Sequence, residues 1–124
     1  MPSWQPNWRD VEWDHRAADE AVQSLRQAAT FVEETRAQRR QRAAEATAEW
    51  RGRFREEFDG HLSRALRRAA ELAGELRAKA DEIAGADESA RLEQRNREHE
   101  RDRWRREKQE EDERNRLLSL GLLP

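Results

Sequence analysis

The sequence contains no cysteine and no tyrosine, and it has only three prolines and five glycines in 124 residues. Without cysteine the chain forms no disulfide and offers no thiolate ligand to a metal. No stretch reaches the roughly 18 to 20 consecutive apolar residues of a membrane-spanning helix, so no membrane insertion is expected. The first ten residues, MPSWQPNWRD, lack the basic start and apolar segment of a cleaved signal peptide. We therefore expect a protein that is cytoplasmic as synthesised, and any export would use another route.

Bulky apolar residues are also scarce. Hydrophobic residues make up 35% of the chain, many of them alanine, whereas charged residues make up 42%. So little apolar surface predicts a thin core for a lone domain, and it favours an elongated helical molecule that shares an interface with a partner. The 25 basic and 27 acidic residues nearly cancel. This balance argues against nucleic acid as the main partner, because nucleic acid selects a basic face.

Two long segments carry small and apolar residues at alternating steps of three and four, which predicts helices with one apolar face. We expect the first helix at about residues 7–49, with Asn7, Asp10 or Asp14 as alternative N-caps and Trp8 on its apolar stripe. The second helix is expected at about 54–90, and Gly85 would permit a kink. The large residues that we expect to form a partner-binding seam are Val22, Leu25, Val32, Leu62, Leu66, Leu72, Leu76 and Ile83.

The composition of residues 91–124 differs from that of the two predicted helices, and it changes again at residue 117. Residues 91–116 are mostly charged with interleaved signs, and Trp104 is the one large aromatic residue among them. This composition predicts a solvated helical extension. Residues 117–124, LLSLGLLP, are then apolar, which fits either a disordered end or a docking peptide. The docking interpretation makes binding residues of Trp104, Leu117, Leu118, Leu120, Leu122 and Leu123.

The predicted fold class is all-α. Two matched stripes joined by a short break at residues 50–53 predict an antiparallel two-helix hairpin within residues 1–90. Two helices alone cannot bury both faces of their stripes, so we expect the hairpin to dimerise into a four-helix bundle. The charged segment then forms a long helical C-terminal extension. Trp4, Trp8 and Trp13 either cap the open end of this bundle, against residues 85–96, or contact a partner.

The break itself reads Trp50-Arg51-Gly52. Gly52 lets the backbone leave the helix because it adopts positive φ without a Cβ clash, and Trp50 can cover the end of the bundle. This tripeptide at the middle of a helical chain, followed by Phe54 and Phe58, resembles the WXG (Trp-X-Gly, ESAT-like) helical hairpins of type VII secretion. The resemblance spans residues 10–90, and the residue pattern of segment 13–34 is similar to that of actinobacterial members.

The resemblance implies a binding function. It implies a type VII secretion substrate, or the partner or chaperone of one, that forms a homodimer or a heterodimer with another WXG-type hairpin. Further partners implied are a secreted toxin or the secretion ATPase, with export that needs no cleaved signal peptide. One feature of the family is missing, because the Tyr-x-x-x-Asp/Glu export signal has no counterpart in a chain without tyrosine. The nearest candidate, Trp104, is followed four residues later by Lys108 rather than by an acid.

Catalysis is not expected. His15, His61 and His99 lie too far apart along such a hairpin to share a metal, and no catalytic or phosphate-binding motif occurs. We therefore predict no enzyme activity, no metal and no cofactor. The basic clusters at 36–42 and 64–68 form either a solvated face or a collar for an acidic partner. The alternative function is an adaptor coiled coil that docks through residues 117–123, and a nucleic-acid-associated helical protein is a third class.

Overall fold

The computed structural model describes residues 2–122, and it contains two helices, α1 (His15–Ala46) and α2 (Arg53–Ser119). No strand occurs within these residues, so the all-α prediction is confirmed. The chain divides into two compact units. The first, Asp14–Ala86, is the hairpin unit. The second combines Met1–Trp13 with Asp87–Pro124 and is the arm unit, named after the N-terminal arm at residues 2–13.

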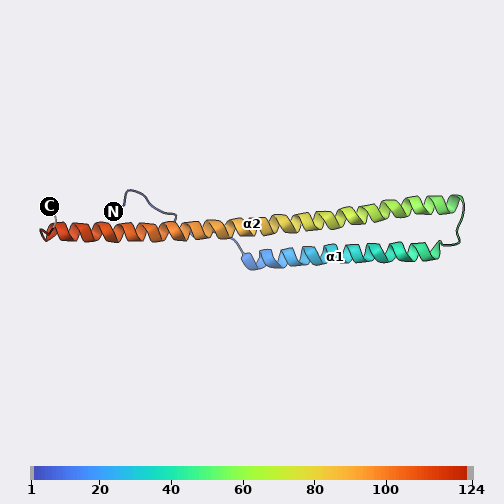
Figure 1. The fold of residues 1–124 in the computed structure, drawn as a ribbon, viewed down its shortest axis with the longest axis horizontal. Helices are drawn as coiled ribbons and strands as arrows, with labels where there is room; N and C mark the ends of the chain where they lie inside the picture. The colour runs from blue at the N-terminus through green and yellow to red at the C-terminus, as the bar shows by residue number, and fades with distance from the viewer. Residues whose placement is uncertain (1, 123–124) are drawn as a thin grey trace. The chain divides into compact units, whose positions relative to one another are not determined.

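In the hairpin unit, α1 and the first part of α2 lie side by side and run antiparallel (Figure 1). Arg26 of α1 pairs with Asp81 at 3.4 Å, and Arg36 donates to the carbonyl oxygen of Leu66 at 2.9 Å. The predicted hairpin is thus present. The apolar residues buried between its helices are all small, because alanine lets two helix backbones approach closely; they are Ala18, Ala29, Ala43, Ala73 and Ala80.

The first helix begins later than the sequence predicts, at His15 rather than near residue 7. Asp14 is the N-cap, and its side chain accepts a hydrogen bond from the amide of Ala17 at 2.9 Å. Residues 7–13 remain non-helical, because side chains of α2 bind their backbone: Arg101 donates to the carbonyl oxygen of Asn7 at 2.9 Å. The prediction that Trp8 lies on the stripe of the first helix is therefore wrong.

The turn occupies residues 47–52 rather than 50–53, since α1 ends at Ala46 and not near residue 49. Thr47 is the C-cap: it is buried, and its amide and its hydroxyl both donate to the carbonyl oxygen of Ala43, at 3.0 and 2.6 Å. The amide of Trp50 then donates to the carbonyl oxygen of Thr47 at 3.0 Å. Gly52 has φ +83° and its carbonyl oxygen receives the first bond of α2, from the amide of Glu56 at 3.2 Å. The glycine at this position is thus explained by its left-handed backbone.

α2 includes Gly85 and continues to Ser119, so the helix has no break at Gly85 or at residue 90. Its end lies inside the apolar tail and has the pattern of a Schellman motif. The amide of Leu122 donates to the carbonyl oxygen of Leu117 at 2.9 Å, and that of Gly121, with φ +71°, to that of Leu118 at 3.1 Å. Residues 117–122 therefore do not form the disordered end considered above, and Leu123 lies outside the described residues.

Gly52→Ala is expected to destabilise the hairpin by about 1–2 kcal/mol, because a side chain disfavours the left-handed backbone. A Cβ at Gly52 would meet nothing within 4 Å, so the effect would come from conformation rather than from a clash. Gly74→Ala is the matched control. Its site in α2 is equally open, and alanine there should add about 0.5–1 kcal/mol of stability. Urea unfolding followed by circular dichroism measures both, and changes of the same sign would contradict the assignment.

Candidate protein-binding surfaces

The two sides of the hairpin seam differ in chemistry. On one side, a groove with a volume of about 230 Å³ opens between α1 and α2. Its charged lining residues are both arginines, Arg36 and Arg39; its other lining residues are Phe31, Val32, Thr35, Leu62, Ala65, Leu66 and Ala69. Phe31 is 68% exposed here, and Leu72, seven residues after Ala65 and hence on the same face of α2, is 45% exposed. We call Phe31, Thr35, Ala65 and Leu72 the apolar flank.

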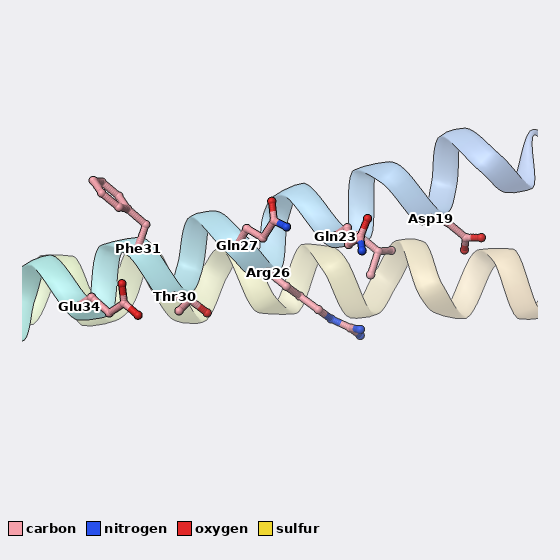
Figure 2. Close-up of a pocket in the computed structure, with 8 residues that line it drawn as sticks. Asp19, Gln23, Arg26, Gln27, Thr30, Phe31 and Glu34 are labelled. Carbon is pink, nitrogen blue, oxygen red and sulfur yellow. The ribbon is translucent and has the colours of Figure 1, made fainter.

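The opposite side is held by ion pairs. Arg77 donates to both carboxylate oxygens of Glu33, which lowers the pKa of Glu33 and raises that of Arg77. Arg26 and Asp81 form the second pair. Figure 2 shows the division on α1: Phe31 points away from α2, whereas Arg26 extends across it. The polar groove drawn there has a volume of about 600 Å³ and is lined by Asp19, Val22, Gln23, Arg26, Gln27, Thr30, Phe31 and Glu34.

The structure divides the seam residues predicted from the sequence into two groups. The half-buried residues of the seam are Val22, Leu25, Val32, Leu62, Leu66, Leu76 and Ile83. Leu72, by contrast, remains exposed on the apolar flank. Phe31 was missed because it directly precedes Val32 and so falls off the stripe by one residue. A large apolar residue directly beside the stripe is the sequence signal that could have identified Phe31 as a residue that faces a partner.

The turn end presents aromatic side chains. Trp50 packs edge-on against Phe58, with ring centroids 5.6 Å apart and an interplanar angle of 65°. Trp50 is nevertheless 45% exposed, and Phe54 is 82% exposed. Arg55 binds the carbonyl oxygen of Thr47 and pairs with Asp59 at 3.0 Å, which ties the start of α2 to the end of α1. Trp50 therefore does close its own hairpin, and it leaves a large part of its ring available.

In the arm unit, the N-terminal arm lies along α2 and runs antiparallel to it, as the pairs Trp13–Asp87, Val11–Gln94 and Trp4–Glu107 indicate. The charged segment is thus not merely solvated; it binds the arm. Trp13 donates to Asp87 at 2.8 Å, which agrees with packing on residues 85–96. Trp4 and Trp8 bind further along than that expectation, at Glu107 and Trp104.

Trp104 is the centre of these contacts. Its indole N–H donates to the carbonyl oxygen of Trp4 at 2.9 Å, and its ring meets that of Trp8 edge-on at 5.3 Å. The guanidinium groups of Arg103 and Arg105 lie 4.2 and 5.5 Å from the ring centroids of Trp4 and Trp8. Trp104 was predicted as a binding residue, but nothing in its spacing indicated that the arm is what it binds.

Arg101 anchors the middle of the arm. It donates to the carbonyl oxygens of Asn7 and Arg9 at 2.9 and 2.7 Å, and to the carboxylate of Asp10 at 2.8 Å. Gln94 donates to the same carboxylate at 2.9 Å. The hydrogen bond from Gln94 and then that from Arg101 lower the pKa of Asp10 below its ordinary value of 3.8.

No metal-binding cluster of three or more histidine, cysteine or acidic side chains exists between residues 2 and 122. Over the same span, neither helix has a stretch long and apolar enough to traverse a bilayer. Comparison of the chain with protein-family models, with curated proteins and with solved structures finds no match. The surfaces described above are therefore the basis for a functional proposal.

The lowered pKa of Asp10 predicts an acid-sensitive arm. A carboxylate with a depressed pKa stabilises the folded arm fully above its ordinary value of 3.8, and this contribution is lost as the pH falls through the folded-state pKa. We expect the tryptophan fluorescence of a Trp50→Phe variant, in which every remaining tryptophan belongs to the arm unit, to change over this acidic range. Adding Asp10→Asn should reduce that change. An identical titration with and without Asp10 would contradict the assignment.

Proposed function

We propose that the protein is a non-catalytic helical interaction protein whose hairpin pairs with a second helical hairpin through the apolar flank. The observation that carries this proposal is the contrast between the interior of the hairpin seam and the apolar flank beside it. Alanines fill the interior, while Phe31 and Leu72 remain exposed beside a groove with an apolar floor. Exposed large apolar residues gathered next to a groove are typical of protein-binding surfaces. Completion of a four-helix bundle would bury them.

The WXG resemblance supports a more specific form of this proposal: a type VII secretion substrate, or the partner or chaperone of one. Trp50, the left-handed Gly52 and Phe58 form a closed turn with an exposed ring, which suits contact with a partner. The second hairpin would be another copy or a different WXG-type chain. A secreted toxin and the secretion ATPase are the further partners of this proposal.

The apolar C-terminal end supports a second candidate, an adaptor of a larger assembly unrelated to secretion. The Schellman motif fixes the end of α2, and it leaves Leu118, Leu120 and Leu122 exposed. An ordered apolar end has a lower entropic cost of docking than a disordered one. Under this proposal, Leu118→Ser with Leu120→Ser abolishes the larger assembly and leaves hairpin pairing intact.

Phe31→Glu is expected to weaken homodimerisation on the order of 100-fold, because each of two buried phenylalanines contributes at least about 1.5 kcal/mol. Gln109→Glu adds the same charge to an exposed position of the arm unit and should leave the dissociation constant unchanged. Analytical ultracentrifugation over a micromolar concentration range measures both. A wild-type chain that stays a folded monomer throughout, and that binds no co-expressed hairpin, would exclude pairing through this flank.

Secretion is tested separately. We expect the protein in the culture medium of its native host, and we expect it to be retained in a strain without the type VII apparatus. A Trp50→Ala variant should be exported less, while Trp13→Ala, which alters the arm unit, serves as the matched control. Retention of the wild-type chain in the cytosol of both strains would favour the adaptor function instead. The Leu118→Ser/Leu120→Ser variant then decides whether the apolar end carries that function.

A further inference from the structure

The surface of α2 that meets the arm has the chemistry of a peptide-binding site. In the hairpin unit, one series of positions spaced by seven along α2 reads Leu66, Ala73 and Ala80. The same spacing continues through Asp87, Gln94 and Arg101, and the neighbouring series ends at Arg97 and Trp104. At the positions of α2 that face the arm, polar and aromatic residues thus stand where the hairpin unit has leucine and alanine. We call Asp87, Gln94, Arg97, Arg101 and Trp104 the polar seam.

The polar seam binds the backbone of an extended chain rather than the side chains of a helix. Arg97 donates to the carbonyl oxygen of Arg9 at 3.1 Å, and Gln94 accepts from the amide of Val11 at 2.8 Å. Arg101 adds its bonds to the carbonyl oxygens of Asn7 and Arg9. These contacts require backbone groups that are free of intrahelical bonds, so they select an extended segment over a helix.

The indole groups of the arm supply the selectivity. Trp4 donates to Glu107 at 2.6 Å and Trp13 to Asp87 at 2.8 Å, while Trp8 packs on Trp104 at 5.3 Å. Three tryptophans at spacings of four and five residues therefore each meet a distinct partner on α2. Tryptophan is enriched where binding energy is concentrated, because it buries a large rigid area and donates one hydrogen bond.

We propose that the polar seam is a binding site for an extended, tryptophan-bearing segment, and that the N-terminal arm of a second copy can occupy it in place of the chain's own arm. The arm is joined to α1 through Trp13 and Asp14, and its contacts with α2 are all non-covalent, so an identical arm from another molecule can make the same contacts. Such an exchange links two copies by contacts that each already makes internally. It does not depend on pairing through the apolar flank.

Within one molecule the arm competes at an effective concentration in the millimolar range. Exchange is therefore most visible when one copy has a defective arm and the other a defective seam. The arm-defective variant carries Trp4→Ala and Trp8→Ala. The seam-defective variant, in which the polar seam is altered, carries Arg101→Ala and Trp104→Ala. Both also carry Phe31→Glu, so that hairpin pairing through the apolar flank makes no contribution.

Each variant alone is expected to be monomeric, and an equimolar mixture at tens of micromolar should give a one-to-one complex by native mass spectrometry. The intact arm of the seam-defective copy then lies in the intact seam of the arm-defective copy. A mixture that remains monomeric would overturn the exchange. Because the Phe31→Glu background removes the apolar flank from the experiment, this result leaves the proposed pairing of hairpins untouched.

A second measurement tests the site itself without relying on the folding of the seam-defective chain. A fluorescent peptide of residues 2–13 should bind the arm-defective full chain at least tenfold more tightly than the wild type, whose own arm competes. Adding Arg101→Ala to the arm-defective chain should abolish peptide binding. Arg106→Ala, which removes an exposed arginine of the same helix, is the control and should have no effect. Equal anisotropy titrations for all four proteins would overturn the proposal.

Discussion

The hairpin unit depends on the close approach of α1 and α2 through alanine. Ala29, Ala73 and Ala80 are completely buried, and no larger apolar side chain of the unit is buried to that extent. Alanine contributes little area per residue, so a seam of this kind stabilises two helices only modestly. Leucines and valines lie half-buried at its edges, and Phe31 lies outside it. This choice of small interior residues is the physical reason for the proposed pairing with a second hairpin.

Both helices and the turn between them could be predicted from the sequence, because periodicity and turn chemistry agree there. The alternating steps of three and four predicted both helices, and glycine at position 52 predicted a change of backbone direction that the left-handed φ confirms. The early end of α1 was not predictable from the tripeptide alone. It occurs at the buried Thr47, whose amide and hydroxyl both donate to the carbonyl oxygen of Ala43, and hydrogen bonds at a helix end have no signature in hydrophobic spacing.

The arm could not be predicted because its conformation depends on residues about ninety positions away in the sequence. Trp8 has the spacing of a helical stripe residue, yet the backbone near it is bound by Arg97 and Arg101. Long-range hydrogen bonds of this kind override local propensity. They also give a role to Arg97 and Arg101, which lie in a segment whose composition alone predicts a solvated surface.

One long helix thus serves two kinds of partner by changing the residues at its repeating positions. In the hairpin unit the contacts are mainly apolar, whereas in the arm unit they are hydrogen bonds to charged groups and contacts between cations and aromatic rings. Dissolved ions screen the second kind of contact and leave the first almost unaffected. Within the hairpin unit, salt weakens the exposed ion pairs Arg77–Glu33 and Arg26–Asp81 but not the alanine interior, so the salinity of the surroundings acts mainly on how firmly the arm is held.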